Sequence, residues 1–301
     1  MFKRLIVVIP LFVFLPLGLL AQTSGFDFPK EEKKLSEILD SIVREQDFAK
    51  KNELNKNFVD KLAVVLQNDK AFDYPFDSLL QVGKVRSLDN RVRIFTWNIP
   101  QPAGFQKYFG FVMLQTTTGN KVISLIDRRG DYKLPHSEQG SAEKWFGALY
   151  YDIIDFEHNG RNHYVLLGVD LHDIFSSKRI LEVLSVSEDG SLGFGIPIFK
   201  VDRSIISRVI FEYSSRATMV LRWDKTHRTI VCSHLTPMQP SFAGNYRYYV
   251  PDLSFDGFRF NKPYWEFVPD IDIRNPSRKP AARIQAPTEN YDPGFLYRAG
   301  R

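Results

Sequence analysis

The sequence predicts an α+β fold in which a pair of amphipathic helices precedes a large antiparallel β domain. Two observations carry this prediction. No Gly or Pro occurs between Pro29 and Pro75, and apolar residues recur there at helical spacing. From Val85 onward, short runs of β-branched and aromatic residues are separated by turn residues. The aromatic content of 14% also favours β structure.

The chain begins with the pattern of an export signal. Residues 1–22 combine a basic start with an apolar run over residues 5–20 and a small residue, Ala21, at a plausible cleavage position. This layout is typical of a secretory signal peptide. The alternative is an uncleaved N-terminal anchor, although the run is short for a membrane span. We therefore expect an exported protein, periplasmic or associated with the outer membrane, without a transmembrane span after cleavage.

Residues 26–80 form the predicted helical region. Apolar stripes indicate two helices, at about 31–47 and 52–68, separated by a short polar break. In the first helix, Leu35 and Leu39 lie on one stripe because they are four residues apart. The opposite faces are rich in both Lys and Glu, which is typical of solvated helices rather than membrane-surface helices.

Residues 84–273 form the predicted antiparallel β domain. Hairpin signals such as Asp256-Gly257 connect many of the runs, and connections this short require antiparallel neighbours. A sandwich, a curved sheet and a propeller-like arrangement all fit the number of runs. The predicted strands are 92–99, 108–115, 121–127, 148–156, 163–169, 180–186, 194–199, 208–213, 217–223, 229–233, 247–250, 257–260 and 265–269.

Residues 274–301 form a basic, Pro-containing tail that we expect to be disordered. This tail holds six basic and two acidic residues. The whole chain has a net charge of +5, so much of the positive charge belongs to the two ends. The body is close to neutral, which argues against a nucleic-acid partner.

The single cysteine, Cys232, allows no intramolecular disulfide. It lies in an apolar run, where a small buried hydrophobe is the expected role rather than a reactive thiol. The sequence contains no phosphate-binding loop of the Walker type, no dinucleotide fingerprint and no G-x-S-x-G elbow. We therefore expect no bound organic cofactor.

Five motifs together resemble a family of exported, uncharacterised Bacteroidota envelope proteins. The motifs are Trp145-Phe-Gly-Ala-Leu-Tyr-Tyr151, Tyr164-Val-Leu-Leu-Gly-Val-Asp170, Phe211-Glu-Tyr-Ser214, Pro251-Asp-Leu-Ser-Phe-Asp-Gly257 and Trp265-Glu-Phe-Val-Pro-Asp270. The Ala21-Gln22 junction fits the same picture. The resemblance implies an exported, envelope-associated protein and assigns no catalytic residues.

The first candidate site is a hydrolytic group formed by Asp170, His172 and His234. Residues 170 and 172 would point to the same side of a strand, as a His–carboxylate pair requires. Polar residues that cap the end of a strand are the structural alternative. Ser233 and His234 cannot form a catalytic pair with each other, because neighbouring side chains in a strand point to opposite faces.

The second candidate is a calcium loop. Asp252, Ser254 and Asp256 supply oxygen atoms at alternate positions before Gly257, as calcium loops do. The loop lacks the downstream bidentate Glu, because Pro263 stands at position 12. The alternative is a β-turn with Asp-Gly at its tip.

The third candidate is an aromatic binding surface formed by Tyr249, Tyr264, Trp265 and the basic Arg259. Such a platform would suit a glycan or a protein partner. Packing of the same residues in the core is the alternative.

Three functions follow from these candidates. The preferred one is a non-enzymatic accessory or binding protein of the cell envelope, with an envelope protein or a glycan as its partner. The alternatives are an exported hydrolase built around Asp170, His172 and His234, and a binding module stabilised by calcium.

Overall fold

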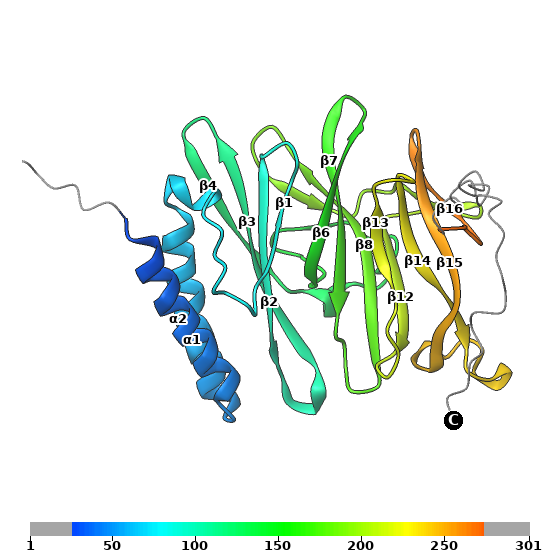
Figure 1. The fold of residues 1–301 in the computed structure, drawn as a ribbon, viewed down its shortest axis with the longest axis horizontal. Helices are drawn as coiled ribbons and strands as arrows, with labels where there is room; N and C mark the ends of the chain where they lie inside the picture. Colours follow the sequence, from blue (N-terminus) through cyan, green and yellow to red (C-terminus); the bar gives the residue numbers. More distant parts are fainter. Residues whose placement is uncertain (1–25, 274–301) are drawn as a thin grey trace, which may run out of the picture.

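The computed structural model describes residues 26–273, in which two helices and three stacked β-sheets form successive layers (Figure 1). The predicted α+β class is therefore confirmed. The predicted signal peptide (residues 1–22) and the predicted tail (residues 274–301) lie outside the described residues. Within residues 26–273, no helix is both long and apolar enough to cross a membrane.

The helices are α1 (Phe28–Arg44) and α2 (Phe48–Leu66). Both begin a few residues earlier than predicted, because an aspartate caps each N-terminus. The Asp27 side chain accepts a hydrogen bond from the backbone N–H of Lys30, and Asp47 does the same for Lys50. The sequence search for apolar periodicity does not detect such caps.

The helices cover one face of a sheet with the order β1-β2-β3-β4. Its strands are β1 (Gly83–Arg86), β2 (Val92–Pro100), β3 (Gln106–Thr116) and β4 (Gly119–Ile126). Alternate residues of β2 point to opposite faces of the first sheet, and each face packs into a different hydrophobic core. Phe95 and Trp97 pack with Phe58 of α2, whereas Ile94 faces the second sheet. The helical region therefore shares its core with the first sheet.

The second sheet lies in the middle of the molecule and is buried on both faces. Along β7, Tyr164 and Leu166 pack toward the first sheet, and Val165 and Leu167 pack toward the third. This two-sided burial explains the continuous apolar run in the sequence. The strands are β5 (Gly140–Ser141), β6 (Leu149–His158), β7 (Arg161–Asp170), β8 (Ser176–Val186), β9 (Leu192–Phe194) and β12 (Arg208–Ser214).

The third sheet has the order β11-β10-β16-β15-β14-β13. Strands β10 and β16 are parallel, whereas the other pairs in this sheet are antiparallel. Its strands are β10 (Phe199–Val201), β11 (Ser204–Ile206), β13 (Leu221–Asp224), β14 (Thr229–Pro237), β15 (Tyr249–Asn261) and β16 (Tyr264–Val268).

Two strand predictions are wrong. The predicted strand 194–199 is divided between two sheets, because the chain leaves β9 at Gly195, which has a φ of 76°. The predicted strands 247–250 and 257–260 belong largely to one long strand, β15. Asp256-Gly257 is therefore no hairpin turn, since Asp256 pairs with Cys232 in the middle of the sheet.

Candidate functional site

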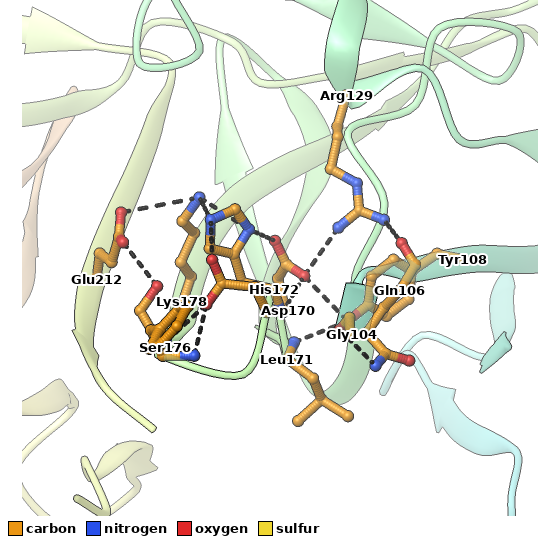
Figure 2. A network of polar contacts seen from close by, with 12 residues as sticks. Gly104, Gln106, Tyr108, Arg129, Asp170, Leu171, His172, Ser176, Lys178 and Glu212 are labelled. Atoms are coloured by element: carbon orange, nitrogen blue, oxygen red, sulfur yellow. Dashed lines mark hydrogen bonds and ion pairs between the residues drawn. The ribbon is translucent and has the colours of Figure 1, made fainter. Parts of the chain in front are cut away.

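A network of polar side chains joins the first and second sheets (Figure 2). Its centre is Asp170, the last residue of β7, which is fully buried. Asp170 Oδ1 accepts hydrogen bonds from Arg129 Nη1 at 2.8 Å and from the Tyr108 hydroxyl at 3.1 Å. Burial and the negative charge of Asp170 raise the pKa of Tyr108 well above its usual value. This part of the network holds two layers together, because Tyr108 belongs to the first sheet and Asp170 to the second.

His172 continues the network at the turn after β7. Its backbone has a φ of 47°, and its N–H donates to Asp170 Oδ1 at 2.8 Å. Lys178 Nζ lies 3.2 Å from Nε2 and 3.3 Å from Nδ1 of the ring. Burial and the nearby ammonium group of Lys178 lower the pKa of His172. The ring is therefore a neutral acceptor at pH 7, because a lysine ammonium can only donate.

The network ends at Glu212 on the edge strand β12. Glu212 and Lys178 are direct partners in the β8–β12 ladder. Ser176 Oγ donates to Glu212 Oε1 at 2.7 Å, and Lys178 Nζ lies 3.8 Å from Glu212 Oε2. Figure 2 shows the resulting chain of contacts from Arg129 through His172 to Glu212.

Glu212 also lines a cavity of about 340 Å³, which we call the His234 cavity. The cavity lies where β12 meets β14, β15, β16 and the 3₁₀ turn η5 (Tyr246–Tyr248). Its polar lining residues are His136, Glu212, Ser233, His234, Tyr246, Tyr249 and Asp256, and its apolar lining residues are Ile210, Phe211, Leu235 and Phe267. Titratable side chains and apolar side chains therefore converge on one hollow, as in many ligand sites.

His234 and Asp256 form a hydrogen-bonded pair in this cavity. The β14–β15 register shifts between Ser233 and Leu235, at the position of His234. His234 Nδ1 lies 2.8 Å from Asp256 Oδ2, while Asp256 Oδ1 accepts from the Asp270 N–H at 3.0 Å. The hydrogen bond to Asp256 raises the pKa of His234. Within the described residues no hydrogen bond involves His234 Nε2, so this atom is available to a ligand.

The structure separates the three residues of the candidate hydrolytic group. Asp170 and His172 lie together, with His172 Nδ1 at 3.8 Å from Asp170 Oδ2. His234 belongs to a cavity that neither Asp170 nor His172 lines, and no ion pair or hydrogen bond in the described chain joins it to them. Ser233 also lines the His234 cavity, but its Oγ accepts from the Val220 N–H at 3.0 Å, and no hydrogen bond in the described chain joins it to His234.

The candidate calcium residues lie in β15 and not at a turn. Asp252 Oδ1 accepts from the N–H and the hydroxyl of Ser254, and Asp256 faces His234. β15 is irregular here, because Leu253 has a φ of 75° and residues 252–254 have no partner in the β14–β15 register. In residues 26–273, no group of three or more His, Cys, Asp or Glu side chains is arranged to share a metal ion.

The candidate binding surface is divided between the core and the surface. Trp265 is 1% exposed and belongs to the core between the second and third sheets, where Tyr264 packs beside it. Trp265 is therefore no surface platform, because β16 turns its ring inward against Phe156. Arg259 is exposed and donates from Nε to Thr229 Oγ1, and of this set Tyr249 lines the His234 cavity.

Cys232 is fully buried, as the sequence predicts, and burial raises the pKa of its thiol. The sequence analysis did not identify Glu212, His136 or Lys178 as site residues. Each lies in an ordinary run or loop, and only the pairing of distant strands reveals its neighbours.

No protein-family model, curated protein or solved structure matches the chain.

Proposed function

We propose that the protein is an exported, non-enzymatic binding protein that holds a sugar unit of an envelope glycan in the His234 cavity. The observation that carries this proposal is the convergence of His234, Asp256 and Glu212 with two tyrosines on one apolar-walled hollow. The support for export is the signal-peptide pattern of residues 1–22.

The chemistry of the cavity suits a sugar. The hydroxyl groups of a sugar both donate and accept hydrogen bonds. A sugar site therefore needs carboxylates, which accept from these hydroxyls, and a group such as imidazole, which donates or accepts according to its protonation. Asp256 and Glu212 supply the acceptors, and the free Nε2 of His234 supplies the second kind of partner. The rings of Tyr246 and Tyr249, whose centroids are 4.9 Å apart, offer apolar surface to the C–H face of a pyranose.

The same cavity is less suited to hydrolysis by a covalent route. The Ser233 hydroxyl oxygen already accepts a hydrogen bond from the Val220 N–H. Cys232 is buried, and burial raises the pKa of its thiol, which disfavours the reactive thiolate. Both carboxylates already accept hydrogen bonds, Asp256 from His234 and Glu212 from Ser176. These hydrogen bonds hold the two carboxylates in place as acceptors for a ligand and do not activate either of them as a nucleophile.

The His234–Asp256 pair supports one second candidate, an exported hydrolase. In that mechanism His234 Nε2 removes a proton from the water whose oxygen bonds to the anomeric carbon, and Asp256 orients the ring and stabilises the imidazolium. The imidazolium then gives the proton to the sugar oxygen that leaves as the glycosidic C–O bond breaks. Incubation with an N-acetylglucosamine tetramer separates the two candidates. Release of new reducing ends that is lost in His234→Gln would favour the hydrolase over the binding protein.

Calorimetric titration with the N-acetylglucosamine tetramer and with soluble peptidoglycan fragments tests the binding proposal. We expect saturable binding that weakens at least about tenfold in His234→Ala and in Glu212→Gln, because each loses a hydrogen bond to the sugar. The control is His158→Ala, which alters a half-buried histidine at the end of β6, outside the lining of the cavity. The proposal fails if no probe binds, or if the cavity variants bind as well as the control.

A further inference from the structure

We propose that a groove beside the His234 cavity binds an acidic, apolar peptide segment of a partner protein. The groove has a volume of about 750 Å³ and is called the Arg247 groove below. It is formed by the β7–β8 loop at Ile174 and Phe175, the chain after β12 at Arg216, and the segment between β14 and β15 that carries Met238 and Arg247. No residue lines both this groove and the His234 cavity, so the inference stands independently of the sugar proposal.

Large apolar side chains are exposed along the groove. Ile174 is 64% exposed, Phe175 55% and Met238 59%. Phe242 and Tyr248 form one wall, with their rings stacked at a centroid distance of 4.4 Å. Isolated exposed apolar residues are common, but a cluster of them around one hollow is typical of a binding surface.

The charge of the groove selects the partner. Arg216 and Arg247 are the two ionisable groups of its lining apart from Tyr248, and neither forms a salt bridge within the described residues. Against the effect of burial, backbone hydrogen bonds and the charge of Arg247 lower the pKa of Asp173, which directly precedes Ile174 in the chain. The Arg247 guanidinium lies over the Phe175 ring at 5.3 Å, which holds the cation beside the apolar floor. A peptide that alternates acidic and apolar residues complements both features.

Backbone contacts hold the three segments in place before any partner binds. The Ser215 N–H donates to the Phe175 carbonyl at 2.9 Å, and Ser215 Oγ donates to the Ile174 carbonyl at 2.9 Å. The Met238 N–H donates to the Tyr248 carbonyl at 3.0 Å. A preformed groove lowers the entropy cost of binding a peptide.

Charge also argues against the chain's own C-terminal segment as the occupant. Residues 274–301 hold six basic residues and two acidic ones, so the two arginines of the groove repel them. A separate protein with an acidic segment is the occupant that the charges favour.

Fluorescence anisotropy tests this inference. The probe is a labelled pool of octapeptides in which Asp or Glu alternates with Leu, Phe or Tyr, and the comparison pool has Lys at every acidic position. We expect the acidic pool to bind and the Lys pool not to bind. Affinity for the acidic pool should fall at least about tenfold in the Arg216→Gln/Arg247→Gln double variant, and it should weaken as salt is raised.

The matched control is Arg203→Gln, which removes an exposed arginine from the turn between β10 and β11. Its affinity for the acidic pool should equal that of the unaltered protein. The inference is overturned if neither pool binds, if the Lys pool binds equally well, or if the double variant binds like the control. Sedimentation velocity that shows self-association lost in the double variant would also overturn it, because a second copy would then be the occupant.

Discussion

His172 and His234 have opposite pKa shifts, and their neighbours explain the difference. Lys178 and burial disfavour a charged His172, whereas the hydrogen bond to Asp256 favours a charged His234. A lowered pKa in the folded protein means that His172 supports folding above its ordinary pKa of 6.5 and loses that support as pH falls. A raised pKa means that His234 supports folding below 6.5 and loses that support as pH rises through the folded pKa.

Replacement of each histidine should therefore change the pH dependence of stability in opposite directions. Between pH 7 and pH 5, we expect His172→Gln to lessen the acid-induced loss of stability and His234→Gln to increase it. Urea unfolding at several pH values measures both effects. Identical slopes in the two variants would contradict this assignment of their environments.

The buried Arg208–Glu182 pair makes a second test at the residue scale. Both side chains are 0% exposed, and Arg208 Nε donates to Glu182 Oε2 at 2.8 Å. Glu182 also accepts a short hydrogen bond from the Tyr150 hydroxyl. We expect Arg208→Met to cost about 3–5 kcal/mol in urea unfolding, because it leaves a buried carboxylate without its cation. The Arg208→Met/Glu182→Leu double variant should recover much of that loss, and the absence of any recovery would contradict the account.

At the scale of elements, the sequence predicts most helices and strands because each buries one or two regular faces. The helices were recognisable from Leu35 and Leu39, and the central strands from runs such as 163–169. The predicted turn at Asp256-Gly257 was wrong, because the glycine has another cause. The Asp256-Gly257 sequence is typical of a turn, but here Gly257 lies within β15, where the backbone of β14 comes too close for a larger side chain. A Cβ at Gly257 would lie 2.9 Å from the Ile230 carbonyl oxygen.

Gly257→Ala should therefore destabilise the third sheet. We expect a cost of about 1–3 kcal/mol in urea unfolding, since the carbonyl of Ile230 belongs to a paired strand and cannot move freely. Gly130→Ala is the control, because a Cβ at Gly130 meets no atom within 4 Å. Equal stability of the two variants would show that β15 does not pass so close to β14.

At the scale of the whole molecule, the strands that line the His234 cavity, β12, β14, β15 and β16, lie at the end away from the helices (Figure 1). The sequence analysis assigned His234 and Asp256 to different candidate sites, because 22 positions separate them. Pairing of β14 with β15 unites them, and pairing of β8 with β12 brings Glu212 to Lys178. Long-range strand pairing of this kind has no signature in a single sequence. His234, Asp256 and Tyr249 were therefore predictable as single candidates, whereas Glu212 and the grouping of all four residues were not.

Hydrogen exchange with and without the N-acetylglucosamine tetramer tests most directly whether the His234 cavity is the binding site. We expect the sugar to slow exchange in the segments 229–237 and 246–256 and to leave α1 and α2 unchanged. These segments carry the lining residues Ser233, His234, Leu235, Tyr246, Tyr249 and Asp256. The His234→Ala variant should lose this protection at the same sugar concentration. Protection confined to the helices or the first sheet, or no protection at a saturating concentration, would contradict the account.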